Sequence, residues 1–252
     1  MTMTTSAPAR PREPKLDRDI AMMLAATEYK RYTDLLRSLS PDDWTRQTDC
    51  PAWDVRAMAG HNLGMAELSA SFLEQRRQTS TAAKAGGVFI DALTDLQVRK
   101  HETKTPAEVV ARYEAVTPKA ARGRRRTPGF VRKREMPVPQ RINDVMEKWC
   151  VGFLTDVILT RDVWMHRVDT CRATGRDMTL TADHDGFLVD DVVNEWAGRH
   201  GAAYTLHLAG PAGGSWSRGE GGPEYRLDAV EFCRILSGRA TGDGLLSTEV
   251  PF

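Results

Sequence analysis

The sequence predicts an α+β protein in which a helical bundle is followed by a small domain of mixed helix and strand. Before Gly175, four long segments carry apolar side chains at helical spacing, and two of the connections between them are long, as in four-helix bundles. After Gly175, shorter segments alternate between helix and strand patterns. A chain of 252 residues has room for two domains. We therefore expect a disordered tail over residues 1–15, the bundle over 16–175 and the α+β domain over 176–252.

The first two bundle helices are predicted over residues 16–39 and 53–78. Apolar residues of the first segment follow the three- and four-residue steps of a helix face, and they include Ile20, Met23, Leu24, Leu35 and Leu36. Pro41 cannot continue this helix and marks its end. Asp54 stands near the start of the second helix, where a carboxylate favours the positive end of the helix dipole.

The third and fourth bundle helices are predicted over residues 105–121 and 141–173. Thr105-Pro106 is a typical helix start, with proline at the first helical position. Gly175 ends the fourth helix. The connections are less regular, and for them we expect a short helix over 88–96 and irregular structure over 122–140.

The C-terminal segment contains two further helix patterns that flank strand patterns. The glycine-rich stretch 210–222 is typical of a turn between two strands. The predicted elements are a helix over 183–199, a strand over 203–208, a returning strand over 225–227 and a helix over 228–237.

The composition excludes several classes of protein. The hydrophobic fraction of 41% and the charged fraction of 27% are those of an ordinary soluble protein. The net charge of +1 gives no overall attraction to nucleic acid or to an anionic membrane. No apolar run approaches the roughly 20 residues that span a bilayer, and the N-terminus has no apolar core of a secretory signal. We expect a cytoplasmic protein, with neither nucleic acid nor membrane as partner, as a monomer or a homodimer.

The four cysteines, Cys50, Cys150, Cys171 and Cys233, form no Cys-x-x-Cys pair and suggest no disulfide framework. A reducing compartment is the simplest setting for them. Cys50 precedes Pro51 near the start of the second helix, where the helix N-terminus would lower its pKa. The alternative is that Cys50 is a small buried residue without chemical function.

Three residues on two of the predicted helices have the chemistry of metal ligands. Asp162 and His166 are four residues apart, so both side chains extend from one helix face. His61 lies on the second helix and offers a third ligand. Three protein ligands with an open position are typical of a catalytic metal site. Asp169 follows His166 on a similar face and would orient its imidazole. The alternatives are an exposed Asp–His pair and a core histidine.

Three blocks of the chain resemble the DinB-like, mycothiol-dependent maleylpyruvate isomerase family. The resemblance covers nearly the whole chain from about residue 16. The blocks are Thr48-Asp49-Cys50-Pro51-Ala52-Trp53-Asp54-Val55-Arg56 with His61-Asn62-Leu63-Gly64, then Thr160-Arg161-Asp162-Val163-Trp164-Met165-His166-Arg167-Val168-Asp169 with Ala173-Thr174-Gly175-Arg176, and finally Phe232-Cys233-Arg234-Ile235-Leu236-Ser237-Gly238-Arg239 through Gly244-Leu245-Leu246 to Val250-Pro251-Phe252.

The resemblance implies a DinB-like four-helix bundle that holds a divalent metal, usually zinc, and a C-terminal domain similar to sterol-carrier-type folds. It implies His61, Asp162 and His166 as the metal ligands. The family's isomerase has a glutamate where this chain has Asp162, whose side chain is shorter. An arginine of the C-terminal domain would bind the thiol cofactor or the anionic substrate, and both Arg234 and Arg239 are candidates for that catalytic role.

The implied activity is that of a metal-dependent enzyme whose nucleophile is a low-molecular-weight thiol, mycothiol. The thiol would add to a small electrophile and then leave, as in an isomerase, or stay on it, as in an S-transferase. One alternative is a non-catalytic protein that binds a metal and a small ligand. The other is a DNA-associated regulator that uses a basic loop, comprising Lys119, Arg122, Arg124, Arg125, Arg126, Arg132, Lys133 and Arg134.

Overall fold

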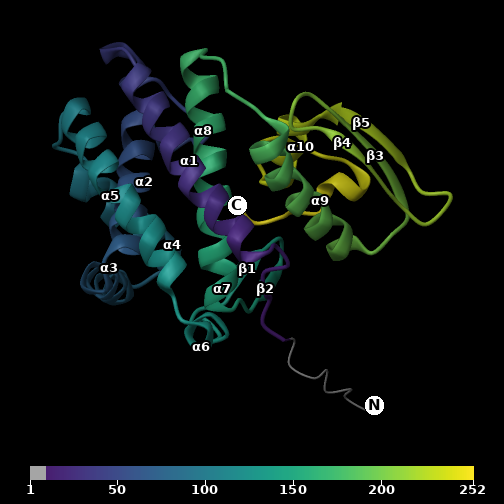
Figure 1. The fold of residues 1–252 in the computed structure, drawn as a ribbon, viewed down its shortest axis with the longest axis horizontal. Coiled ribbons are helices and arrows are strands. Elements are labelled where there is room, and N and C mark those ends of the chain that lie inside the picture. Colours follow the sequence, from purple (N-terminus) through teal and green to yellow (C-terminus); the bar gives the residue numbers. More distant parts are fainter. Residues whose placement is uncertain (1–9) are drawn as a thin grey trace.

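The protein, represented by a computed structural model that describes residues 10–252, has a helical N-terminal region beside a small C-terminal α+β region (Figure 1). This confirms the predicted fold class. The helices are α1 (Arg18–Ser38), α2 (Val55–Ala70), α3 (Phe72–Ala85), α4 (Phe89–His101), α5 (Pro106–Arg126), α6 (Gly129–Arg132), α7 (Val151–Phe153), α8 (Leu159–Thr174), α9 (Phe187–His200) and α10 (Ala229–Leu236). The strands are β1 (Gln140–Ile142), β2 (Val145–Glu147), β3 (Tyr204–Ala209), β4 (Gly214–Arg218) and β5 (Glu224–Asp228).

The bundle consists of α1, α2, α5 and α8, and the α3–α4 pair packs on the outer side of α2 (Figure 1). Its interior holds a cluster of buried apolar side chains from all four helices, among them Tyr32, Leu36, Leu63, Tyr113 and Val163. The predicted starts of the first and third bundle helices lie within two residues of those in the structure. Asp17 caps α1 by accepting from the backbone N–H of Asp19 and Ile20, and Thr105 with Glu108 forms a reciprocal cap on α5.

The single helix predicted over residues 53–78 is wrong, because the chain breaks at Ser71. Ser71 has extended backbone angles, with φ −145° and ψ 123°, and its hydroxyl accepts from the backbone N–H of Glu74 as the cap of α3. The apolar pattern continues through the break in Phe72 and Leu73, which are exposed. The break lets α3 fold back along α2, and α4 follows over residues 89–101, longer than the predicted 88–96.

α5 runs past its predicted end and crosses the end of α2 at Gly123. A Cβ atom at Gly123 would lie 2.1 Å from the backbone oxygen of Ser69, so the two helices approach closely only because this residue is glycine. We expect Gly123→Ala to lower the free energy of unfolding by about 1–3 kcal/mol through overpacking. Chemical denaturation would measure it. Gly129→Ala is the matched control, since a Cβ there meets no atom within 4 Å, and equal effects of both substitutions would contradict the close approach.

The fourth helix predicted over residues 141–173 is wrong in its first third. Residues 140–147 form a β hairpin, in which Ile142 pairs with Val145 and Asn143 turns the chain with a positive φ of 51°. Asparagine tolerates that region better than most residues. The helix proper begins with α7, continues through a π-helical turn over Leu154–Ile158, and becomes α8.

The C-terminal sheet has the strand order β4-β3-β5. β3 confirms the strand predicted over 203–208, and α9 and α10 confirm the two helices. The turn predicted over 210–222 contains β4, which pairs antiparallel with β3, so the returning strand is β4. β5 instead pairs parallel with β3. β4 was not predicted because its residues are mostly polar and exposed, so they show no apolar alternation.

The two regions share one hydrophobic core. It joins Leu24 and Trp164 of the bundle to Val193, Trp196 and Phe232 of the C-terminal region. The chain ends against α8 (Figure 1). There Arg161 donates to the backbone oxygen of Pro251, and Trp164 stacks with Phe252. The division at residue 175 stays a prediction, since the buried cluster spans both sides of it.

A buried ion pair connects the hairpin to α9. Arg199 donates to both carboxylate oxygens of Glu147, at 2.6 and 3.0 Å, and Arg12 donates to the same carboxylate. Burial alone would raise the pKa of Glu147, but the hydrogen bonds from Arg199 and Arg12 outweigh it and lower the pKa to about 2. The tail predicted over 1–15 therefore contacts the folded chain at Arg12, whereas residues 1–9 lie outside the described residues.

The lowered pKa of Glu147 predicts a loss of stability in acid. A carboxyl group whose pKa is lower in the folded chain stabilises it above the unfolded pKa, near 4.5, and this contribution disappears as the pH falls toward 2. We expect the free energy of unfolding to fall between about pH 5 and pH 2, and to fall less steeply in Glu147→Gln. Denaturant unfolding at several pH values measures both slopes. Identical slopes would show that Glu147 does not contribute.

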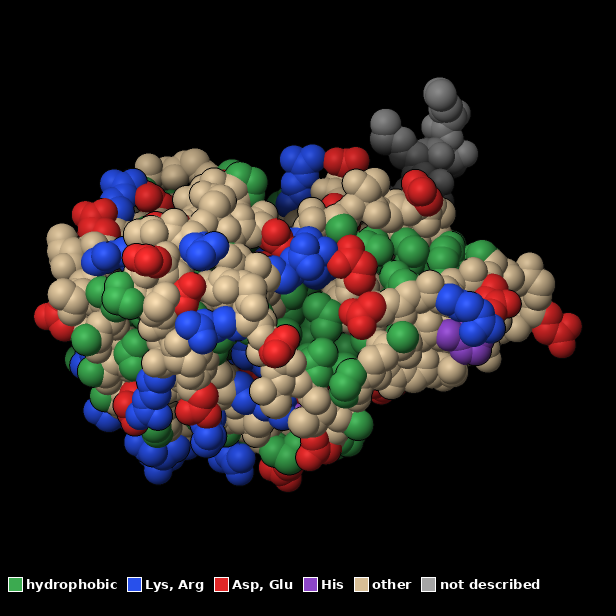
Figure 2. Space-filling model, turned by 90° about the horizontal axis from the view of Figure 1, so that it is seen from above, with side chains coloured by type: hydrophobic (Ala, Val, Ile, Leu, Met, Phe, Trp, Pro, Cys, Tyr) green, Lys and Arg blue, Asp and Glu red, His purple; other side chains and the backbone are tan. Residues whose placement is uncertain are grey.

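Among residues 10–252, no helix is both long enough and apolar enough to cross a membrane. On the face shown in Figure 2, Lys and Arg side chains are interspersed with Asp and Glu side chains, and apolar side chains gather between the larger and the smaller region.

Candidate metal centre

Short-range hydrogen bonds define the turn that begins α2 and carries His61 into the bundle. Thr48 donates through its hydroxyl to the backbone oxygen of Trp53 at 2.7 Å, and Gln47 donates to the same oxygen at 2.9 Å. Asp54 then caps α2 by accepting from the backbone N–H of Ala57. His61 follows inside the helix and is 3% exposed.

α8 supplies the other two predicted ligands from one face. Asp162 and His166 follow the π-helical turn of residues 154–158, a local widening that is frequent beside functional sites. The Oδ1 atom of Asp162 lies 3.2 Å from His166 Nε2, and its Oδ2 atom lies 3.5 Å from His61 Nε2. One carboxylate thus faces both imidazoles. Each residue offers one donor atom to a group in which these atoms lie within 4.8 Å of one another.

The three residues fit a divalent cation. Asp162 Oδ2 is buried and has no hydrogen-bond partner among the described residues, although it lies between two imidazoles. Two imidazole nitrogens and a carboxylate oxygen are a ligand set that zinc and similar ions accept. The Asp162 side chain is 20% exposed, whereas those of His61 and His166 are 4% and 6% exposed. The side of the group at Asp162 is therefore where a further ligand would enter.

The charges of the group reinforce one another. Burial alone would raise the pKa of Asp162, but the charge of His166 and the close contacts of the carboxylate with both imidazoles lower it, so the carboxylate is ionised. Burial alone would lower the pKa of His166, but Asp162 and Asp169 raise it to about 9. A metal ion bound here would have to displace the proton of His166, so metal binding would release protons.

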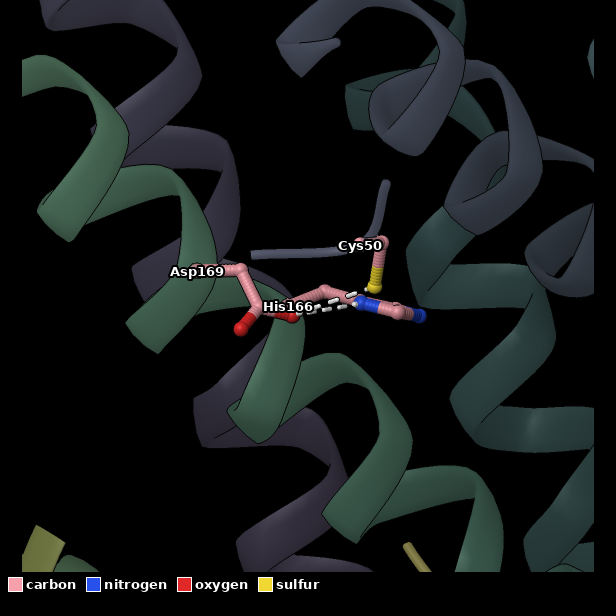
Figure 3. A group of neighbouring side chains, drawn as sticks. All are labelled: Cys50, His166 and Asp169. Atoms are coloured by element: carbon pink, nitrogen blue, oxygen red, sulfur yellow. Dashed lines mark hydrogen bonds and ion pairs between the residues drawn. The ribbon is translucent and has the colours of Figure 1, made fainter. Parts of the chain in front are cut away.

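Asp169 joins the group to the C-terminal region through Arg239. Figure 3 shows Asp169 and His166 on α8, with Cys50 of the loop before α2 beside them. Its Oδ2 atom lies 3.2 Å from His166 Nδ1. Arg239 donates to both oxygens of Asp169, through Nε at 2.7 Å and Nη2 at 2.8 Å. The carboxylate therefore holds the imidazole of His166 and the guanidinium of Arg239 in fixed positions.

Cys50 lies beside this pair. Its Sγ atom is 3.9 Å from Asp169 Oδ2 (Figure 3) and 3.7 Å from Arg239 Nη2. Burial raises its pKa to about 11, which outweighs the nearby charge of Arg239. The lowered pKa expected from the helix N-terminus is therefore wrong. The alternative, a small residue without chemical function, stays a prediction, and Cys50 is partly buried.

Arg234, the other candidate arginine, makes different contacts. It donates to Asp49 Oδ2 at 3.0 Å and to Glu231 at 2.5 Å, and Arg172 donates to the same oxygen of Asp49. Arg239 contacts Asp169, which in turn touches His166. The carboxylate partners of Arg234 are Asp49 and Glu231 instead.

Comparison with known proteins identifies the family. The model of the mycothiol maleylpyruvate isomerase N-terminal domain matches residues 25–171, more than half of the chain. The chain belongs to this family. The matched residues include His61, Asp162 and His166.

Solved structures bear out the fold over 94% of the chain. A crystal structure of the mycothiol-dependent maleylpyruvate isomerase has a TM-score of 0.56 and 16% sequence identity, over 94% of this chain and 95% of that one. A variant of that enzyme, with one histidine replaced by alanine, matches equally at 15% identity. At this identity the similarity concerns the fold alone. No curated protein matches the chain.

Among the residues described, two further groups have the side chains of metal ligands. Cys50, His166 and Asp169 form one of them, which shares His166 with the first group.

The other group, Glu28, His184 and Asp185, is buried and already filled by arginine. Arg167 donates to Glu28 at 2.6 and 3.0 Å and to Asp185 at 2.8 Å. A cation there would meet the positive charge of Arg167, so we assign this group to the packing of α1, α8 and the turn before α9.

The basic run is not the single loop that the sequence predicted. Its first five residues, Lys119, Arg122, Arg124, Arg125 and Arg126, belong to α5, and Arg132 belongs to α6. Arg124 is 2% exposed and donates to the backbone oxygen of Thr155 and to the hydroxyl of Thr160. Arg132 pairs with Asp156. One of the eight charges is thus paired with a carboxylate and another is buried inside the protein, which weakens the DNA alternative.

Sequence reasoning missed one polar contact to a predicted ligand. Gln97 of α4 lies with its Oε1 atom 2.8 Å from His61 Nδ1. Glutamine carries no charge and belongs to no short ligand motif, and residues 79–104 had the weakest helix pattern. Its position inside a helix face that packs on α2 was the only available signal.

Proposed function

We propose that the chain is a metal-dependent enzyme that uses mycothiol as a nucleophile, for thiol transfer to a small electrophile or for thiol-assisted isomerisation of one. The observation that carries the proposal is the convergence of His61, Asp162 and His166, with Asp162 on the accessible side. Membership of the family supports the thiol, since the family is named for mycothiol.

In this proposal His61, Asp162 and His166 hold the cation, with zinc as the expected metal. The cation would supply the positive charge that favours the deprotonated form of a thiol. Trp53 packs against the two histidines, with ring centroids 4.9 Å from His61 and 5.8 Å from His166. Asp169 keeps the imidazole of His166 oriented through Nδ1.

Of the two arginines, we propose Arg239 for contact with an anionic substrate or cofactor. Its Nε and Nη2 atoms are occupied by Asp169, which fixes the plane of the guanidinium. Its Nη1 atom has no hydrogen bond among the described residues, and the side chain is 15% exposed. A guanidinium fixed in this way presents one edge to a carboxylate of a bound ligand.

The test is turnover of maleylpyruvate with and without mycothiol, measured by absorbance and by mass spectrometry of any thioether product. We expect thiol-dependent turnover that is lost in His166→Ala and reduced in Arg239→Met. An isomer without net thiol consumption would mark an isomerase, and a stable thioether a transferase. If the protein binds zinc tightly but forms neither product, with maleylpyruvate or with other activated double bonds, the alternative of a non-catalytic binding protein would be favoured.

A further inference from the structure

A relay of buried amides connects His61 to the α3–α4 pair outside the four-helix bundle. His61 Nδ1 lies 2.8 Å from Gln97 Oε1, and Gln97 Nε2 donates to Gln78 Oε1 at 2.9 Å. Gln78 Nε2 in turn donates to the backbone oxygen of Gly64 at 3.1 Å and to Glu74 at 2.9 Å. Gln97 and Gln78 are both 0% exposed. Side chains of α2, α3 and α4 therefore take part in one chain of hydrogen bonds.

The far end of the relay determines the direction of every hydrogen bond in it. The hydrogen bond from Arg77 keeps the pKa of Glu74 low, so this carboxylate only accepts, as a backbone oxygen does. Gln78 must face both acceptors with its NH2 group, which leaves its oxygen toward Gln97. Gln97 must then turn its own NH2 group to Gln78 and its oxygen to His61.

We infer that Gln97 is a positioning residue that holds His61 in the tautomer with the proton on Nδ1. An oxygen facing Nδ1 can only accept from it, so in the neutral imidazole that binds a metal the lone pair lies on Nε2, the atom that faces Asp162. The inference rests on the proposed function, in which His61 is a metal ligand through Nε2. The hydrogen bond also fixes the plane of the ring, because Nδ1 and the ring rotate together.

The side chain of Gln97 fits against α2 because residue 64 is glycine. A Cβ atom at Gly64 would lie 2.5 Å from Cγ of Gln97, so Gln97 reaches His61 because residue 64 has no side chain. Met65 Sδ also faces the NH2 group of Gln97, at 3.0 Å, as an acceptor. The break at Ser71 completes the arrangement, since it returns α3 along α2 and brings Gln78 to Gly64.

The two histidines are therefore oriented by different chemical groups. His166 has a carboxylate, Asp169, at Nδ1, whereas His61 has a neutral amide. A carboxylate makes an imidazole a more basic ligand than a neutral acceptor does. Through the relay, the α3–α4 pair orients His61 at the candidate metal centre, a contact that the four bundle helices do not supply.

The test is the zinc affinity of Gln97→Leu, measured by competition with a chromophoric chelator. We expect a loss of about 10- to 100-fold, the usual effect of removing the hydrogen-bond partner of a metal-binding histidine. Gln97→Glu, which keeps an acceptor for Nδ1–H, should recover most of the affinity. Leu93→Ala is the control for packing, because Leu93 is a buried residue of the same helix without a polar contact, and it should leave the affinity within a few-fold.

Two further readouts separate orientation from packing. In zinc-loaded wild type, ¹H–¹⁵N correlation spectra should show a slowly exchanging Nδ1 proton on His61, which persists in Leu93→Ala and disappears in Gln97→Leu. Gln78→Leu should lower the zinc affinity several-fold in the wild-type background and leave it unchanged in the Gln97→Leu background, because it acts only through Gln97.

The outcomes distinguish this inference from the proposed function. Tight zinc binding that is unchanged in Gln97→Leu, or that falls equally in Leu93→Ala, would overturn the role of Gln97 and leave the metal centre in place. Wild-type protein that binds no zinc would overturn the proposed function and this inference together.

Discussion

Replacing Arg167 by leucine is expected to lower the free energy of unfolding by about 3–5 kcal/mol, because it removes the guanidinium that joins two buried carboxylates. Glu28 then keeps His184 as an ionisable partner, and Asp185 keeps Arg31. Arg167 is 2% exposed and donates to Glu28 at 2.6 and 3.0 Å and to Asp185 at 2.8 Å. Glu28 and Asp185 are 1% and 0% exposed, so water cannot replace the lost contacts. Denaturant unfolding followed by circular dichroism measures the change.

Arg172→Leu is the matched control for this prediction. Arg172 stands on the same helix and also pairs with a carboxylate, Asp49, but its side chain is 50% exposed. An exposed pair of this kind contributes about 0–1 kcal/mol. Equal losses in Arg167→Leu and Arg172→Leu would mean that the buried network does not stabilise the junction of the two regions.

The network matters for the metal centre because it orients α8. Arg167 follows His166 directly in the chain and extends from a different side of the helix, where it contacts Glu28 of α1 and Asp185 in the turn before α9. Trp164 donates to Asp185 at 2.9 Å in the same network. The face of α8 that carries Asp162 and His166 is therefore fixed by buried contacts on the other face.

Replacing Asp162 by alanine is expected to abolish the thermal stabilisation of the protein by zinc. A ligand that binds only the folded state stabilises it by about 2.7 kcal/mol at 100 times its dissociation constant. Asp162 faces both His61 and His166, so its removal takes away the anionic ligand and the group that links the two imidazoles. Thermal unfolding with and without excess zinc measures the difference.

Asp144→Ala controls for charge in this experiment, because Asp144 lies in the hairpin turn with a side chain 96% exposed. It should keep the full stabilisation by zinc. If zinc stabilised Asp162→Ala as strongly as wild type, the ion would bind elsewhere and the assignment of Asp162 as a ligand would be wrong.

Periodicity was sufficient for the helices whose apolar faces are long and whose ends are capped. α1 follows its predicted segment and α5 begins where predicted, since each buries an apolar stripe and begins at a side-chain cap. α9 and the π-helical turn before it together cover the helix predicted over 183–199. The break between α2 and α3 escaped because the apolar residues Phe72 and Leu73 follow it directly. The Ser71–Glu74 spacing is a capping signature and was the local signal for it.

The β hairpin escaped for a related reason. Its strands have three residues each, too few to display an alternating pattern, and Val145 and Met146 are exposed. Asn143-Asp144 between two apolar residues is a turn signal that could have located it. The short polar strand β4 was missed in the same way.

The candidate metal centre was predictable in part. Helical spacing placed Asp162 and His166 on one face, and the family resemblance added His61, which spacing alone could not bring near them. The same helical spacing also placed Asp169 near His166. Gln97 was not, because its contact with His61 depends on how α4 packs on α2 and on the absence of a side chain at Gly64.

The most direct test of the metal centre is the metal content of the purified protein by elemental mass spectrometry, with wild type beside His166→Ala. We predict close to one equivalent of a divalent metal in wild type, with zinc expected, and its loss in the variant. His166 is the residue to replace because both its ring nitrogens face carboxylates of the group. Wild-type protein without metal after reconstitution, or a variant that retains it in full, would contradict the account.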